Sequence, residues 1–322
     1  MAIVDWPLRV PFTISRETQT SIGCVHLTLI DPDGHRGRSE AIGVDYAGET
    51  PATIAAEIEA VRARIEAGLT LDVAQRLLPA GGARNALDCA LWDLAAKRSR
   101  VPAWKAAGLT GFHPRPTAFT FGIMDERALR IAARAHAEFA LLKVKTDREH
   151  GLDPVRIVHE EVPDARLIVD PNASWGEAEL RRFADALEGL NVALLEQPVD
   201  PAADDILHRV TLPVPVAADE AFTDRASIGA LAGKYQVLNI KLDKTGGLTE
   251  ALACARAGHQ ASFDLMIGCM AGSSLSMAPG VLVAQSCGFV DLDGPLLQEG
   301  DVDHPIVYRG GLIETPSAAL WG

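Results

Sequence analysis

The sequence predicts an α/β protein in which a closed barrel of parallel strands follows a separate α+β segment. From about residue 115 onward, eight short β-rich runs alternate with turns and amphipathic stretches. Strands that alternate with helices form right-handed crossovers in a parallel sheet, and eight such units favour a (β/α)₈ barrel. The rival fold is a doubly wound open sheet, which normally carries a Gly-rich phosphate loop after its first strand. Neither G-x-G-x-x-G nor G-x-x-x-x-G-K-[ST] occurs in this chain, so we favour the barrel.

The N-terminal residues 1–110 follow a different pattern. Residues 24–41 are typical of a β-hairpin, because two arms of alternating apolar residues flank a Pro-Asp-Gly turn. Helical patterns follow over 50–68 and 83–98. This segment is therefore predicted to be α+β and separate from the barrel.

The barrel strands are predicted from short runs rich in β-branched and other apolar residues. They cover 117–122, 141–145, 166–170, 192–196, 215–219, 237–241, 264–268 and 289–293. Two of the intervening helices are clear, over 175–190 and 246–261, because their apolar residues recur at helical spacing. The weakly patterned tail after Pro295 is expected to pack against the N-terminal segment.

Composition restricts the function classes. With 322 residues, 48% of them hydrophobic, the chain has ample apolar content for a core, which excludes intrinsic disorder. The net charge of −13 and the lack of a Lys/Arg block argue against nucleic-acid binding. No signal-peptide pattern and no apolar run of about 18 residues occurs, so no membrane association is expected. Five cysteines without a C-x-x-C motif argue against a disulfide framework or a zinc site and fit a cytoplasmic enzyme.

Charged residues stand at the predicted carboxyl ends of successive strands. They are Lys143 and Lys145, Asp170, Glu196, Asp219, Lys241, and Asp291 with Asp293. From Lys143 the first intervals are 27, 26, 23 and 22 residues, close to one βα unit each. A single acidic residue after a strand is more often a helix cap or a solvated turn. That explanation does not account for five consecutive strands that each end in a charged residue, because removing unpaired charge from water beside an apolar core is costly. Active sites of barrel enzymes lie at this face, so these residues are candidates for a functional site.

These residue types point to a metal flanked by bases. Asp170, Glu196 and Asp219 offer hard oxygen ligands without His or Cys, which suits Mg²⁺ rather than Zn²⁺. Lys143 and Lys145 are two residues apart on one strand, so both face the barrel interior, with Lys241 across the mouth. A lysine acts as a base only when deprotonated, and a neighbouring ammonium and a divalent cation both favour that form.

With these residues the sequence resembles the enolase superfamily, and its muconate-lactonizing subgroup fits best. The resemblance is carried over nearly the whole chain by ARNALDCALWDLAAK, LLKVKTD, LIVDPNASW, LLEQP, VAADE, NIKLDKTGGLTEA and IGCM. It implies a modified (β/α)₇β barrel under an N-terminal α+β capping domain, a Mg²⁺ cofactor and an enediolate intermediate. The use of a Lys base with Mg²⁺ is a known trait of this superfamily. Carried over, Asp170, Glu196 and Asp219 match the metal ligands, and Lys145 and Lys241 match the acid/base pair.

The sequence pattern and the resemblance together lead us to divide the chain into three segments. We expect the capping domain over 1–112 and the barrel with the catalytic residues over 113–298. The tail over 299–322 is expected to pack back on the capping domain.

The Asp291-x-Asp293 motif selects among the reactions of the subgroup. In the family that this sequence resembles, the D-x-D motif is typical of dipeptide epimerases, where it binds the free α-ammonium of the substrate. Two carboxylates, which only accept, pair well with a cation that has three donors. Taken alone, the motif is more often a solvated Asp-Gly turn; beside the metal and lysine set we favour the functional interpretation.

Further substrate contacts are implied by the same resemblance. PFTISRETQT resembles a mobile loop that closes over the substrate, and its Arg16 matches a basic residue that faces an acidic side chain or carboxylate. Thr120, Cys269 and Ala271 are expected to line the pocket. Lys143 is expected to contact the substrate carboxylate besides tuning Lys145. Asp243 and Lys244 receive no role.

The expected reaction is a 1,1-proton transfer at the α-carbon of the C-terminal residue of a dipeptide, preferably L-Ala-L-Glu and its D-Glu epimer. General acid–base catalysis supplies only about 10²–10⁴-fold, so stabilisation of the enediolate has to be the larger effect. The alternatives are a cycloisomerase or o-succinylbenzoate synthase-type lyase, an N-acyl amino acid racemase, and a non-catalytic binding module, against which the two lysines argue. The expected partner is a small molecule, and a homo-oligomer is left open.

Overall fold

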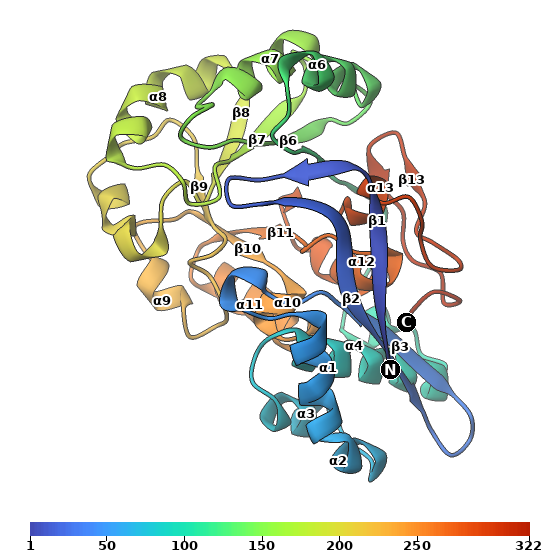
Figure 1. Cartoon of the computed structure of the whole chain (residues 1–322). Helices are drawn as coiled ribbons and strands as arrows, with labels where there is room; N and C mark the ends of the chain where they lie inside the picture. The colour runs from blue at the N-terminus through green and yellow to red at the C-terminus, as the bar shows by residue number, and fades with distance from the viewer.

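The computed structural model describes all 322 residues and contains a barrel and a cap formed by the N-terminal part of the chain (Figure 1). Eight parallel strands form one sheet in the order β12-β11-β10-β9-β8-β7-β6-β5. They are β5 (Phe119–Phe121), β6 (Leu141–Lys145), β7 (Arg166–Asp170), β8 (Val192–Glu196), β9 (Val216–Ala218), β10 (Val237–Ile240), β11 (Asp264–Ile267) and β12 (Phe289–Val290). Each lies within one of the eight predicted strands, and the α/β barrel class predicted from the sequence is confirmed.

The two end strands of this sheet meet and close the barrel. The amide of Ala118, just before β5, donates to the carbonyl of Val290 at the end of β12 (2.7 Å). The amide of Leu292 donates to Oγ1 of Thr117 (3.1 Å). The short β5 and β12 are therefore joined by two bonds that lie outside the regular ladder.

Seven helical connections link the eight strands, and most are amphipathic as predicted. They are α6 (Glu126–Ala135), α7 (Asp153–Glu161), α8 (Glu177–Gly189), η2 (Pro201–His208), α9 (Ile228–Leu231), α10 with α11 (Leu242–Thr245 and Leu248–Gln260) and α12 (Ser274–Ala284). The predicted helices over 175–190 and 246–261 correspond to α8 and α11. The connection from β8 to β9 is a 3₁₀ helix, and α9 is a single turn, so these two crossovers depart from the regular βα unit.

The cap is built on a three-stranded antiparallel sheet, β1 (Ala2–Thr13), β2 (Thr18–Ile30) and β3 (Arg36–Ala41). The predicted hairpin corresponds to the paired β2 and β3. Strand β1 was not expected from the sequence, because Pro7 and Pro11 obscure its pattern. It is an edge strand whose register with β2 shifts between Pro7 and Phe12, and edges and bulges are where a strand tolerates proline.

Six helices follow this sheet along the chain. They are η1 (Asp45–Ala47), α1 (Pro51–Ala60), α2 (Arg62–Glu66), α3 (Leu71–Leu77), α4 (Gly82–Ser99) and α5 (Ala103–Ala106), of which α1 and α4 pack against its strands. The helix predicted over 50–68 is interrupted at Val61, whose ψ of 5° leaves the helical range. The helix predicted over 83–98 is α4, and its buried face packs against β3 and β2.

The C-terminal tail contacts the cap closely. Arg38 of β3 donates to the carbonyls of Ala319 (2.7 Å) and Leu320 (2.6 Å). The indole of Trp321, 2% exposed, donates to the carbonyl of Cys89 in α4 (3.1 Å). Before this, α13 (Gly294–Leu297) leads to a small sheet in which β14 (Leu312–Ile313) pairs with β13 (Tyr308–Arg309) and β4 (Arg115–Pro116). The division at residues 112/113 and 298/299 remains our proposal.

The β1–β2 hairpin reaches from the cap across to the barrel (Figure 1). Its tip, residues 14–17, lies at the carboxyl ends of the strands, where Ser15 Oγ approaches the carbonyl of Asn172 (3.4 Å). At the base of the tip, the amide of Ile123 donates to the carbonyl of Thr13 (2.8 Å). None of the helices combines the length and apolar character needed to cross a lipid bilayer.

Candidate active site

The side chains inside the barrel form layers, because every second residue of a strand faces inward. The lowest layer is apolar and contains one residue from or beside each of the eight strands. It consists of Ala118, Leu141, Ile168, Leu194, Ala217, Val237, Met266 and Phe289. Two residues further along each strand the interior becomes polar. This second layer consists of Thr120, Lys143, Asp170, Glu196, Asp219, Asn239, Gly268 and Asp291. Two residues further still, Lys145, Lys241 and Asp293 reach the mouth.

The ammonium of Lys143 lies at the centre of the second layer. Its Nζ is 2.8 Å from Oε2 of Glu196, 2.8 Å from Oδ2 of Asp291 and 3.1 Å from Oδ2 of Asp170. Burial opposes the charge of Lys143, but these three carboxylates outweigh it and raise the pKa of Lys143. One cation therefore neutralises part of a strongly acidic centre.

Lys145 and Lys241 lie on opposite sides of this centre, and each contacts one of its outer carboxylates. Lys145 Nζ donates to Oδ2 of Asp170 (2.7 Å) and to Oδ1 of Asn172 (3.0 Å). Lys241 Nζ donates to Oδ2 of Asp219 (2.7 Å). The strands that carry these lysines, β6 and β10, are separated by β7, β8 and β9 along the sheet.

Asp170, Glu196 and Asp219 are buried at the ends of adjacent strands, and their environments separate their pKa values. Burial acts against ionisation of Asp170, but Lys145 and Lys143 outweigh it and lower its pKa to about 2. For Asp219, Lys241 and Lys244 likewise outweigh burial and lower the pKa. Burial and the charge of Asp170 together raise the pKa of Glu196 to about 8.

The same three carboxylates fit a divalent cation by their chemistry. Oε2 of Glu196 is buried and accepts no hydrogen bond of good geometry, although Lys143 lies near it. Burial and the charge of Asp170 raise the pKa of Glu196, so a cation bound beside this carboxylate would stabilise its ionised form. The carboxylates do not lie within 4.8 Å of one another as a group, because each is turned toward a lysine. All three are oxygen ligands of the type that Mg²⁺ prefers.

The structure places Asp291 and Asp293 inside the barrel mouth rather than in a solvated turn. Asp291 and Asp293 are 5% and 2% exposed. Thr120 connects them, since its Oγ1 contacts Oδ1 of Asp291 (3.1 Å) and its amide donates to Oδ2 of Asp293 (2.6 Å). Burial and the charge of Asp291 raise the pKa of Asp293 to about 7. Asp291 is paired with Lys143, but Asp293 contacts no cation, so this pair of buried carboxylates suits a cationic ligand group.

These groups share a cavity of about 280 Å³ between the barrel mouth and the cap. Thr120, Lys143, Lys145, Lys241, Asp291 and Asp293 all line it, as do Cys269, Ala271 and Arg16. Asp219 also lines it, whereas Asp170 and Glu196 lie beneath its surface. Ala271 has a left-handed backbone (φ 62°), which fixes the loop after β11 that contributes Cys269.

Several residues at the site were missed or left without a role by the sequence analysis. Lys244, one turn after Lys241, is buried and donates to Oδ1 of Asp219 (2.7 Å) and to the carbonyl of Asn239 (3.0 Å). Asn239 Nδ2 donates to Oε1 of Glu196 (2.9 Å). Asn239 lies two residues before Lys241 in the strand predicted over 237–241, so the period-two rule applied to polar residues other than charges would have found it. Asn172 lies beyond the end of β7 and has a left-handed backbone (φ 45°), so that rule does not place it.

Asp243 joins the barrel to the cap. Its Oδ1 accepts from the amides of Ile42 (3.1 Å) and Gly43 (2.9 Å) and from Nδ2 of Asn85 (3.0 Å). These bonds fasten the segment after β3 to the end of β10. Asp243 therefore has a structural role.

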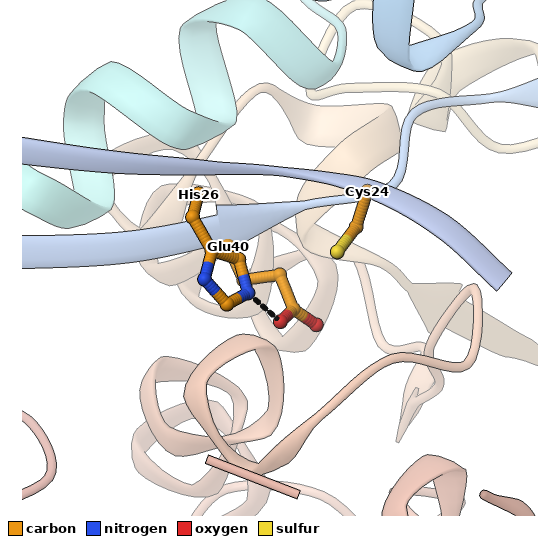
Figure 2. A group of neighbouring side chains, drawn as sticks. All are labelled: Cys24, His26 and Glu40. Carbon is orange, nitrogen blue, oxygen red and sulfur yellow. Dashed lines mark hydrogen bonds and ion pairs between the residues drawn. The ribbon is translucent and has the colours of Figure 1, made fainter. Parts of the chain in front are cut away.

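A second cluster of polar groups lies where the cap meets the loop after β11 (Figure 2). Glu40 of β3 is buried beside Cys24 and His26 of β2. Its Oε2 accepts from Nε2 of His26 (2.6 Å) and from Oγ of Ser273 (2.6 Å), and its Oε1 from the amide of Ser273 (2.6 Å). Both carboxylate oxygens of Glu40 accept hydrogen bonds, so we interpret Glu40 as a structural residue that links the cap to the loop after β11.

Comparison with known proteins places these features in a family context. The family described as "Mandelate racemase / muconate lactonizing enzyme, N-terminal domain" matches residues 1–108, and "Enolase C-terminal domain-like" matches residues 125–319. The chain is 39% identical over 308 residues to L-Ala-D/L-Glu epimerase of Escherichia coli, covering 95% of this chain and 96% of that protein. It is 42% identical over 245 residues to N-acetyl-D-glutamate racemase of Pseudoalteromonas sp., covering 76% of this chain and 78% of that protein.

Two solved structures are similar over nearly the whole chain. An enolase family member from Agrobacterium tumefaciens with homology to dipeptide epimerases, solved with sodium and L-Ala-L-Glu, has a TM-score of 0.97 and 38% identity, covering 100% of this chain and 98% of that one. The dipeptide epimerase of Methylococcus capsulatus, solved with Mg and L-Arg-D-Lys, has a TM-score of 0.88 and 28% identity, covering 98% of this chain and 95% of that one.

Proposed function

The chain belongs to the mandelate racemase/muconate lactonizing enzyme family of the enolase superfamily, and from this premise we propose that it is a Mg²⁺-dependent dipeptide epimerase. The observation that carries the proposal is the placement of Lys145 and Lys241 on opposite sides of one cavity whose wall also presents Asp291 and Asp293. Two bases on opposite faces of a carbon can invert it, and two carboxylates can hold an ammonium.

Asp170, Glu196 and Asp219 are proposed to hold the metal. When bound, Mg²⁺ supplies the positive charge that offsets the negative charge developing on the substrate carboxylate during proton removal. Lys143, which lies among these ligands, is proposed to contact the same substrate carboxylate. Asn239 and Lys244, which donate to Glu196 and Asp219, keep two of the ligands in place.

The proton transfer is assigned to the two outer lysines. One of Lys145 and Lys241 removes the α-proton of the C-terminal residue, and the other delivers a proton to the opposite face. The configuration is thereby inverted, and the roles of the two lysines exchange in the reverse reaction. Asp291 and Asp293 bind the α-ammonium of the N-terminal residue, so that the α-carbon of the second residue lies between the lysines.

The remaining expected residues are proposed to shape the substrate pocket. Thr120 orients the Asp291/Asp293 pair through its two hydrogen bonds. Cys269 and Ala271 line the cavity near this pair, and Arg16 lines it from the hairpin tip. L-Ala-D/L-Glu is the proposed preferred dipeptide, in a cytoplasmic enzyme whose assembly with further copies of itself is left open.

N-acyl amino acid racemisation is the second candidate, and the similarity to N-acetyl-D-glutamate racemase favours it. It uses the same metal and lysines but leaves Asp293 without a cation, since Lys143 is paired with Asp291 alone of the two. The same argument applies to a cycloisomerase or o-succinylbenzoate synthase-type lyase. Because an unpaired buried carboxylate is costly, we place the dipeptide first.

Incubation of a dipeptide library in D₂O, followed by mass spectrometry, tests the proposal. We expect a one-dalton gain in dipeptides with a free α-amine, greatest for L-Ala-L-Glu, and a much smaller gain in N-acetyl-L-glutamate. A greater gain in N-acetyl-L-glutamate than in any dipeptide would assign the chain to the second candidate.

A further inference from the structure

We propose that Glu220 is a positioning residue that holds Arg16 over the cavity and thereby selects dipeptides whose C-terminal residue has an acidic side chain. This inference rests on the proposed function, which already gives the acidic preference and places Arg16 in the pocket, and adds to it the residue that positions Arg16. Neither the sequence analysis nor the assigned chemistry gives Glu220 a role.

The contact between these residues joins the cap to the barrel. Nη1 of Arg16, at the tip of the β1–β2 hairpin, donates to Oε1 of Glu220 at 2.8 Å. The guanidinium also lies over the ring of Tyr46 in η1, with Cζ 5.3 Å from the ring centroid. Arg16 is therefore held from two directions, by a charge and by an aromatic face.

Glu220 is buried more deeply than a surface ion pair requires. Its side chain is 7% exposed against 35% for Arg16, and its Oε2 accepts no hydrogen bond. A buried carboxylate with one unsatisfied oxygen costs free energy. The fold keeps this group beneath Arg16 nonetheless, which points to a role in placing the guanidinium.

Only one edge of Arg16 is used by this contact. Nε and Nη2 donate to no protein group, and Arg16 lines the cavity. The other three cations of the cavity wall, Lys143, Lys145 and Lys241, are each bound to carboxylates. The free edge of Arg16 is thus the one unsatisfied cationic surface available to a ligand, and a planar guanidinium matches a carboxylate in a bidentate manner.

The contacts of the two residues that follow β9 show where that surface lies. Asp219 is contacted by Lys241 inside the barrel, whereas Glu220 is contacted by Arg16 of the hairpin tip. Lys241 and Arg16 line the same cavity, so a substrate whose α-carbon lies beside Lys241 can extend its side chain toward Arg16. An acidic side chain would reach the free guanidinium edge there.

The test compares Glu220→Gln, Arg16→Gln and the double variant on L-Ala-L-Glu and on its neutral isostere L-Ala-L-Gln. For Glu220→Gln we expect kcat/KM for L-Ala-L-Glu to fall by roughly 3- to 30-fold, mostly through a higher KM. This range lies between the effects of exposed and buried ion pairs, because Arg16 is partly exposed and Glu220 is buried. L-Ala-L-Gln should lose much less. In the Arg16→Gln background the Glu220 substitution should add little, since the two residues act together.

The matched control is Glu177→Gln, which removes a carboxylate from an exposed ion pair with Arg181 on α8 and should leave both substrates unaffected. Equal losses on L-Ala-L-Glu and L-Ala-L-Gln, or fully additive effects in the double variant, would overturn the inference. So would a loss of Mg²⁺ affinity in Glu220→Gln that accounts for the lost activity, since Glu220 would then act through Asp219.

A measurement that needs no dipeptide turnover separates this inference from the proposed function. Trypsin cleaves after Arg16, and the Glu220 contact should protect that bond in the ligand-free protein. We expect several-fold faster cleavage of the Arg16–Glu17 bond in Glu220→Gln than in the native chain or Glu177→Gln, measured by mass spectrometry of the digests. Equal rates would show that Glu220 does not hold Arg16, whatever the substrate; a native chain that epimerises no dipeptide would instead refute the proposed function.

Discussion

Nζ of Lys241 lies 2.7 Å from Oδ2 of Asp219, and this base is therefore held by a carboxylate proposed to bind the metal. The same relationship joins Lys145 to Asp170 on the other side of the barrel. Each proposed base thus forms an ion pair with one of the outer carboxylates. Metal binding and base release are expected to be coupled, because both depend on the same carboxylate oxygens.

Removal of the metal should abolish activity. Treatment with EDTA is expected to eliminate epimerisation, and added Mg²⁺ to restore it, because the lysines alone cannot offset charge on the substrate carboxylate. Mg²⁺ should also raise the Tm, since a ligand at about 100 times its Kd stabilises a protein by about 2.7 kcal/mol. Full activity of the metal-stripped protein, verified by elemental analysis, would contradict the metal assignment.

The two lysines should be separable by isotope exchange. Lys145→Ala and Lys241→Ala should each reduce epimerisation by at least about 10²–10⁴-fold, the usual contribution of a general acid or base. Each variant should still exchange the α-proton of one substrate epimer with D₂O, because the remaining lysine serves its own face. The prediction is checked by NMR of L-Ala-L-Glu and L-Ala-D-Glu separately. A variant that epimerises at the native rate would refute the two-base mechanism.

The raised pKa of Asp293 predicts an acidic limit to dipeptide turnover. Below about pH 7 the Asp293 carboxyl becomes protonated and loses the charge that pairs with the substrate ammonium, which stays protonated. Hence kcat/KM for L-Ala-L-Glu should decline as the pH falls through 7. In Asp293→Asn this particular decline should be absent, so the ratio of native to variant kcat/KM should rise with pH. A pH-independent ratio would show that Asp293 does not titrate in the free enzyme.

The Asp293→Asn substitution also separates epimerase from racemase. It keeps the shape of the side chain and one acceptor for the Thr120 amide, but removes a charge from a buried pair. For dipeptides with a free amine we expect a loss on the order of 2–4 kcal/mol, or roughly 30- to 1000-fold in kcat/KM. N-acetylated dipeptides, which have no cation to pair, should be poor substrates of the native chain and lose much less. Equal native turnover of free and N-acetylated dipeptides would mean that Asp291 and Asp293 are not an ammonium site.

The barrel could be predicted from the sequence because eight β-rich runs alternate with helical patterns, and its charged mouth because a strand has a two-residue period. The period that places Leu141 in the apolar floor also places Lys143 and Lys145 above it. Strand β1 escaped prediction because prolines interrupt its alternation, although an edge strand tolerates them.

The partners of the charged residues could not be predicted. Which carboxylate Lys143 contacts depends on the closure of the barrel, which brings Asp291 next to β5 and β6 across 148 residues of chain. Arg16 was expected to lie near the substrate. Its contact with Glu220 could not be predicted, because the two residues are 204 positions apart and no local sequence pattern links them. Lys244 follows Lys241 by about one helical turn, and its presence near the site was evident from the sequence. That its side chain contacts Asp219 could not be predicted, because this depends on the geometry of α10.

The most direct test of the account follows the glutamyl α-carbon of L-Ala-L-Glu in D₂O by ¹H NMR with the native chain and Mg²⁺. The account predicts L-Ala-D-Glu with deuterium at that carbon, no exchange at the alanyl α-carbon, and the same final mixture from either epimer. Retention of the α-proton in both epimers, at an enzyme concentration at which Mg²⁺ binding is verified, would contradict it.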